Sequence, residues 1–141
     1  MPATVSARIL EDGPRNAVLL VQGDNGGSGG GDLAYQPLIL PSALGYIDQA
    51  RNQRAAQLRV DSIEWDIQAE VQMQVLLYWD ATTPQQFYDC IGRANKYFRD
   101  FGGLYVPAGL AGATGGIGIA TKGASTTVDN GYTLLLRLVK Q

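Results

Sequence analysis

The chain has 141 residues, of which 45% are hydrophobic, and its formal net charge is −2. These values predict one folded domain over residues 1–141 with a sizeable core, and they exclude a disordered chain. An isoelectric point near 4.9 with no basic stripe argues against a nucleic-acid partner, and the longest apolar run, residues 75–79, is too short to span a membrane.

Two β-branched segments open the chain, at residues 3–10 and 16–22. The Asp12-Gly13-Pro14 sequence between them is strong turn chemistry, because glycine accepts positive φ and proline fixes the backbone that follows. The pattern predicts an N-terminal hairpin. The N-terminus has no hydrophobic secretory core, so we expect synthesis in a cytoplasm.

A glycine-rich stretch follows at residues 24–32. With hardly any side chain to pack it, the stretch favours a flexible surface loop. The alternative is a calcium site, because Asp24, Asn25 and Asp32 supply oxygen ligands. Their spacing fits no recognised calcium-binding loop, which makes this the weaker interpretation.

The next strand is predicted at residues 33–40, where Pro37 removes a ladder donor and indicates an edge position. Residues 42–57 are the least strand-like part of the chain and allow a helical turn or two. Arg51 and Arg54 lie in this segment and Arg59 follows it. We interpret these arginines as groups that solvate the surface or contact a neighbouring subunit, in preference to an anion site.

The strongest pattern runs over residues 58–80, where apolar and polar residues alternate in two halves. A period of two predicts strands with one buried face. The halves meet at residues 68–70, which predict either a tight hairpin or a bend in one long strand. The predicted core residues of this stretch are Ile63, Trp65, Ile67, Val75, Leu77 and Trp79.

Residues 85–99 are ambiguous, because Phe87, Ile91 and Ala94 have helical spacing while a strand is also allowed. A short strand is predicted at residues 117–122. Asn130-Gly131 then predicts a hairpin turn, and residues 132–140 close the chain as a strand that places Leu134 and Leu136 in the core.

Seven or eight short strands with no sustained helix between them predict an all-β fold. Parallel pairing needs long crossovers for which this chain has no room, so the strands should be antiparallel. We expect a jelly-roll-like β-sandwich with long glycine-rich loops.

The sequence contains few residues that could carry out catalysis. The chain has no histidine, so its one cysteine, Cys90, and its serines lack the commonest activating base. Glu64 and Asp66 share one face of a predicted strand, but carboxylates two residues apart on an exposed face usually only solvate it. We expect no enzymatic activity, no cofactor and no required metal.

Several motifs together resemble small virion structural proteins of tailed bacteriophages. They are Leu10-Glu11-Asp12-Gly13-Pro14-Arg15-Asn16-Ala17-Val18, Val60-Asp61-Ser62-Ile63-Glu64-Trp65, Val75-Leu76-Leu77-Tyr78-Trp79-Asp80-Ala81-Thr82-Thr83, Phe98-Arg99-Asp100-Phe101-Gly102-Gly103-Leu104, Gly112-Ala113-Thr114-Gly115-Gly116-Ile117 and Gly131-Tyr132-Thr133-Leu134-Leu135-Leu136-Arg137-Leu138. The resemblance implies a β-sandwich that decorates or cements the capsid surface. Its implied partners are the major capsid protein and other copies of itself, with which it would form a homotrimer.

The segment 85–95 departs from that pattern and is a candidate for a subunit contact peculiar to this protein. The candidate interface residues are Phe87, Tyr88, Tyr97, Arg51 and Arg54. Two alternatives stay open beside the decoration role. One is a carbohydrate- or partner-binding sandwich of a tail or fibre, and the other is a head–tail joining subunit.

Overall fold

The computed structural model describes residues 2–68 and 73–141, and over these ranges the chain forms nine strands and two short 3-10 turns. Within the same ranges no helix has the length and apolar character needed to cross a membrane. The elements in chain order are β1 (Thr4–Asp12), β2 (Asn16–Asp24), β3 (Gln36–Ile39), η1 (Pro41–Ala43), β4 (Leu58–Gln68), β5 (Gln74–Trp79), β6 (Gln85–Ile91), β7 (Arg93–Tyr97), η2 (Arg99–Phe101), β8 (Ile117–Lys122) and β9 (Gly131–Lys140).

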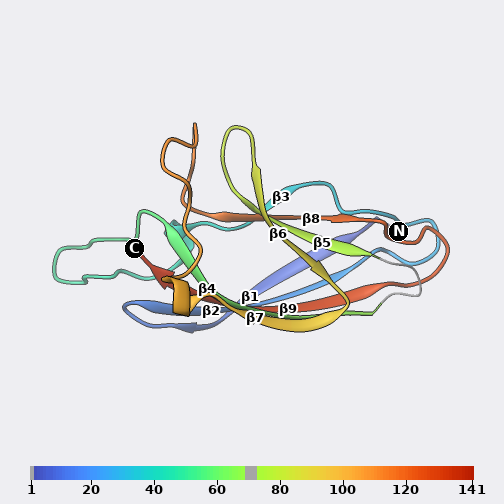
Figure 1. Cartoon of the computed structure of the whole chain (residues 1–141), viewed down its shortest axis with the longest axis horizontal. Helices are drawn as coiled ribbons and strands as arrows, with labels where there is room; N and C mark the ends of the chain where they lie inside the picture. Colours follow the sequence, from blue (N-terminus) through green and yellow to red (C-terminus); the bar gives the residue numbers. More distant parts are fainter. Residues whose placement is uncertain (1, 69–72) are drawn as a thin grey trace.

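The strands form two antiparallel sheets that face each other (Figure 1). One sheet has five strands in the order β1-β2-β9-β4-β7, and the other has four in the order β3-β8-β5-β6. The predicted all-β sandwich is therefore confirmed, with nine described strands where seven or eight were expected. The predicted N-terminal hairpin is present as β1 and β2, and β3, which contains Pro37, lies at a sheet edge as predicted.

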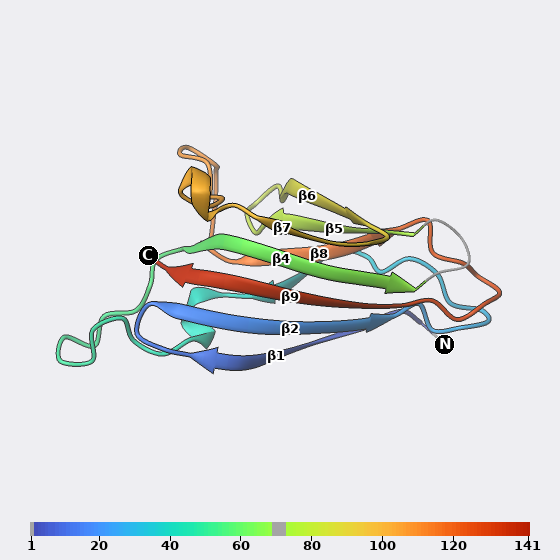
Figure 2. The ribbon, with the colours of Figure 1, turned by 60° about the horizontal axis from the view of Figure 1, so that its bottom comes forward.

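Eight of the strands pair in a nested series. β5 pairs with β6, β4 with β7, β3 with β8, and β2 with β9. This is the pairing of a long antiparallel ribbon that is wound so that its successive segments alternate between two sheets. The order is compatible with the expected jelly-roll wrapping. β1 lies outside the series, beyond β2 at the edge of the larger sheet (Figure 2).

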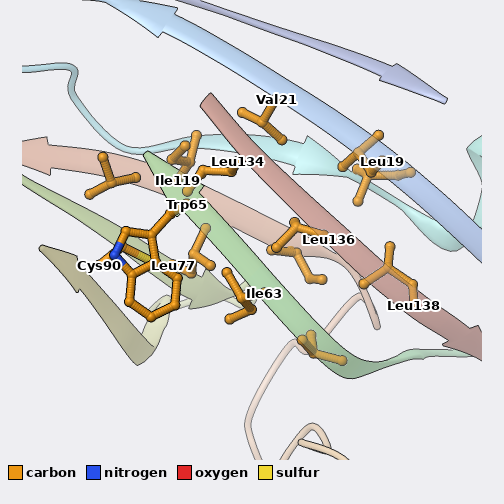
Figure 3. Close-up of a cluster of buried hydrophobic side chains, with 14 of the residues drawn as sticks. Leu19, Val21, Ile63, Trp65, Leu77, Cys90, Ile119, Leu134, Leu136 and Leu138 are labelled. Carbon is orange, nitrogen blue, oxygen red and sulfur yellow. The ribbon is translucent and has the colours of Figure 1, made fainter. Parts of the chain in front are cut away.

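The core fills the space between the sheets, where inward side chains of β2, β4 and β9 meet those of β5 and β8 (Figure 3). Strict alternation places these residues on one face of each strand and sends polar residues to the other. Seven of the eight predicted core residues are buried, namely Ile63, Trp65, Val75, Leu77, Trp79, Leu134 and Leu136. Ile67, near the end of β4, is only partly buried against the core.

The prediction of a hairpin or a bend at residues 68–70 falls mostly outside the described residues; β4 and β5, on either side of it, belong to different sheets, so they are neither a hairpin pair nor one strand. The hairpin predicted at Asn130-Gly131 is wrong. β8 and β9 likewise belong to different sheets. Asn130 does not have the positive φ of a two-residue hairpin turn. It is buried in a loop, where its backbone N–H donates to Asn25 Oδ1 at 2.9 Å.

Two segments are open to helix from their sequence, and residues 85–99 take the strand alternative. Residues 85–99 contain no α-helix but form β6 and β7, which meet at Gly92 with a φ of +70°. That corner carries the chain from the smaller sheet to the larger one, a conformation that favours glycine. In residues 42–57 the only helical turn is the end of η1, and an extended arm held by a bridge between Asp48 and Gln53 follows it.

Candidate interaction surfaces

The glycine-rich loop after β2, predicted to be flexible, is anchored by one buried side chain. Asn25 is 2% exposed. Its amide nitrogen donates to the carbonyls of Ser125 and Val128, while its oxygen accepts from the backbone N–H groups of Gly27 and Asn130. All four hydrogen-bonding positions of the amide are therefore used, and Asn25 ties this loop to the loop before β9.

The oxygens proposed for the calcium alternative have protein partners. Asp24 accepts a hydrogen bond from the N–H of Gly26, and Asp32 accepts from the N–H groups of Gly123 and Ala124. Across residues 2–68 and 73–141 there is no group of three or more metal-ligating acidic, cysteine or histidine residues. The geometry supports the structural interpretation of this loop.

Cys90 is fully buried on the inner face of β6, among the core side chains (Figure 3). Burial, together with the nearby charge of Asp89, raises the pKa of its thiol to about 12. A thiol in such an environment remains protonated at neutral pH and behaves as a small apolar side chain.

The outer face of the larger sheet holds the carboxylates that were considered as a catalytic pair. Glu64 and Asp66 line a shallow, open depression of about 660 Å³ over β4, β7 and β9, together with Arg93. Glu64 accepts a hydrogen bond from Arg137 at 2.8 Å, so one of the two carboxylates is already in an ion pair. The depression is an open sheet surface lined by polar residues and by Trp65, Ala94 and Leu135, whereas a glycosidase cleft would enclose the reacting group.

Two of the candidate interface residues pack within the chain. Phe87 stacks on Trp79 with ring centroids 4.1 Å apart, and Tyr88 contacts Trp65 and Phe98 edge-to-face. Both are half-buried, so each extends the core toward the surface.

The two arginine candidates lie on the arm that follows η1. The side chain of Arg51 is 81% exposed near the tip. Arg54 instead turns back: it donates to the carbonyls of Ser42 and Leu44 and lies over the ring of Tyr46 at 4.5 Å. Arg54 therefore shapes the arm, while Arg51 is available for contact with another molecule.

The most exposed aromatic residue is Phe101, at 80%, and it was not among the interface residues predicted from the sequence. It ends η2, which the chain holds with backbone hydrogen bonds from Phe101 and Gly103 to the carbonyl of Phe98, at 3.0 and 2.8 Å. Phe98 itself is buried in the core. A large apolar ring is thus presented to solvent on a well-anchored turn.

The residues around η2 hold the turn in place and add further exposed aromatic rings. The strand-like residue Leu104 exchanges backbone hydrogen bonds with Val60 of β4, at 3.0 and 2.9 Å. Two further tyrosines, Tyr97 at the end of β7 and Tyr105 just beyond the turn, are each 46% exposed. Together Tyr97, Phe101 and Tyr105 form what we call the aromatic end of the molecule.

Comparison of the sequence with protein-family models and with curated proteins gives no match. Of the five candidate interface residues, Tyr97 and Arg51 are well exposed, Arg54 is committed to the arm, and Phe87 and Tyr88 mainly support the core. The glycines at 102 and 103 were the sequence signal that could have located Phe101, because they mark a sharp turn immediately after an aromatic residue.

Proposed function

We propose that this protein is a structural component of a tailed-bacteriophage virion, where it binds the outer surface of the head and stabilises the shell. Its partner in this proposal is the major capsid protein. The resemblance of its motifs to virion proteins motivates the assignment, and an all-β sandwich of nested strands is an architecture that capsid domains use. The proposal assigns the protein no catalytic step.

The observation that carries the proposal is the exposed ring of Phe101 on its anchored turn. An apolar side chain in water costs free energy that burial against a partner recovers, and exposed aromatic residues are common anchors of protein interfaces. Because the turn is already ordered by backbone hydrogen bonds, docking it costs little conformational entropy. Tyr97 and Tyr105 supply amphipathic contact area beside it.

A decoration protein acts in many copies, so a modest affinity at each site is sufficient when the bound unit contains several linked chains. The resemblance implies a homotrimer as that unit. In this arrangement the aromatic end of each copy contacts the shell, and the exposed arm that carries Arg51 is available for a neighbouring copy or for the shell.

The decisive experiment mixes the purified protein with heads that lack it and locates the bound copies by electron microscopy. We expect density at every local symmetry axis of the head. Density at a single portal vertex would contradict the proposal in favour of a head–tail joining role. Density on the tail would contradict it in favour of a tail or fibre component.

The docking role of the aromatic end is tested in the same assay with Phe101→Ala. Loss of a buried aromatic anchor should weaken binding to heads by tenfold or more. Ile91→Ala is the matched control, because Ile91 is an exposed apolar residue, 42% accessible, that precedes β7 while Phe101 follows it. Equal binding by the two variants would show that the aromatic end does not contact the shell.

A further inference from the structure

β1 is the longest sheet edge of the described chain. It has nine residues and pairs only with β2, and it forms one border of the larger sheet (Figure 2). The other edge strands are shorter: β3 has four residues and contains Pro37, β7 has five, and β6 has seven. A free edge presents backbone N–H and C=O groups that are ready to pair with another strand.

Neither face of β1 is covered by the rest of the chain. Eight of its nine residues are exposed, and only Val5 is partly buried. Ala7 and Ile9 pair with Val21 and Leu19 of β2, whose side chains point into the core, so they continue the apolar inner face beyond the sandwich. Ile9 and Leu10 leave 39% and 46% of their area in water.

The edge has little protection against association. Proteins usually guard such strands with proline or with lysine pointing toward the inner face, and β1 has neither. Its one irregularity is a bulge between Ile9 and Glu11. Apart from this bulge, the strand carries none of these protections, and its length and apolar inner side suit it to pairing with another strand.

The charges of β1 suit a second copy of the same strand. Arg8 pairs with Leu20 and Glu11 with Val18, so both charged groups lie on the outer face of the sheet. Neither forms an ion pair within the described part of the chain. When two copies run antiparallel about a two-fold axis, Arg8 of each strand approaches Glu11 of the other.

The opposite border of the same sheet lacks this self-complementarity. β7 carries Arg93 and Lys96 and no acidic residue, so two β7 edges would repel each other. A head-to-tail contact between β1 and β7 would also place the strands parallel, because alternate strands of an antiparallel sheet share one direction and β1 and β7 are the first and fifth. The antiparallel pairing of β1 with itself avoids both problems.

We propose that β1 is a self-association edge, through which two copies of this chain pair antiparallel and join their five-stranded sheets into one continuous sheet. The pairing is independent of the proposed virion role, since it concerns the free protein. It requires a two-fold axis, and a cyclic trimer would leave the β1 edges unpaired with one another. The expectation of a trimer and the pairing of β1 therefore make different predictions for the protein in solution.

The test uses sedimentation velocity and light scattering on the full-length chain over a range of concentrations. We expect a dimer for the natural sequence. Arg8→Glu and Glu11→Arg should each weaken dimerisation by about tenfold or more, because each change replaces two facing ion pairs with two like-charge pairs. Both positions are exposed, so the melting temperature of the monomer should not change by more than a degree or two.

Mixing two variants with opposite charge changes tests the facing pairs more directly than either variant alone. An equimolar mixture of the Arg8→Glu and Glu11→Arg chains should form a heterodimer, because every facing pair is again of opposite sign. Lys96→Glu on β7 is the control with a matched charge change and should leave the dimer intact. Three outcomes would each overturn the proposal: a natural chain that is monomeric throughout the concentration range, a trimer indifferent to Arg8→Glu, or variants that fail to associate on mixing. Head binding is measured separately, so a monomeric variant that still decorates heads contradicts neither proposal.

Discussion

A buried lysine at the end of β9 offers the most informative stability experiment. Lys140 is 1% exposed, and its ammonium group donates to the Asp12 carboxylate and to the carbonyls of Gly13 and Gly45, the latter two at 2.6 and 3.1 Å. These contacts tie the β1–β2 turn and the base of the arm to the last strand. Lys140→Met keeps most of the side-chain volume and removes the three donors.

The expected loss follows from what the substitution leaves behind. Hydrogen bonds to a charged group contribute about 1.5–3 kcal/mol each, but desolvation of the buried ammonium offsets much of their sum. Asp12 remains 29% exposed in its side chain and can regain water, whereas the two carbonyls regain it less easily. We therefore expect Lys140→Met to lower the free energy of unfolding by about 2–4 kcal/mol.

Urea unfolding at neutral pH measures this difference. Arg137→Met is the matched control on the same strand: Arg137 pairs with Glu64 at 2.8 Å, but its side chain is 44% exposed. An exposed ion pair contributes only about 0–1 kcal/mol, so the control should lose little stability. If the two variants lose the same amount within about 0.5 kcal/mol, burial of Lys140 is not the source of its contribution, and the reasoning fails.

The remaining predictions concern the core, the thiol, the turn and the response to acid. Trp79→Ala should lower the free energy of unfolding by about 3–5 kcal/mol, since the ring is buried; a variant as stable as the parent in urea would contradict this. Cys90, with its pKa raised to about 12, should resist thiol reagents at pH 8 until denaturant is added; rapid labelling of the native chain would show that the site opens. Gly103→Ala should cost about 1–2 kcal/mol and weaken head binding, because its φ is +87° and a Cβ there would lie 2.6 Å from the side chain of Arg59; unchanged melting and binding would refute it. Partial burial would raise the pKa of Asp12, but the hydrogen bonds from Lys140 and Gly45 and the charges of Lys140 and Arg54 outweigh it, so the pKa lies below 3.8. The stability from this group is therefore present above pH 3.8 and lost as the pH falls through the lower folded value, and Lys140→Met should unfold with a weaker pH dependence below pH 4.

Local sequence determined much of the strand framework. Alternation over residues 58–80 predicted which side chains face the core, because a strand sends successive residues to opposite sides whatever its partner is. The Asp-Gly-Pro turn predicted the β1–β2 hairpin for a similar reason, since its backbone preferences act within a few residues. The absence of a sustained helical period was enough to predict an all-β sandwich.

Only the tertiary structure decided which strands share a sheet. The Asn130-Gly131 sequence is a common hairpin signal, yet the buried amide of Asn25 holds that loop in another conformation, and the chain crosses to the other layer. Phe87 and Tyr88 were predicted to be interface residues, but both pack within the chain. Phe87 stacks on Trp79 of the neighbouring strand in its own sheet, and Tyr88 packs on Trp65, which comes from the opposite sheet and is distant along the chain.

Exposure was the other property that sequence alone left open. β1 and β2 have similar apolar patterns, but β2 lies inside the sandwich while β1 extends past it. The apolar side chains of β2 are therefore buried or half-buried, whereas most of those of β1 are exposed. Phe98 and Phe101 are three residues apart in one motif, and the η2 turn buries the first and exposes the second. Burial depends on what the rest of the chain places over a residue, and that is settled only when the two sheets pack together.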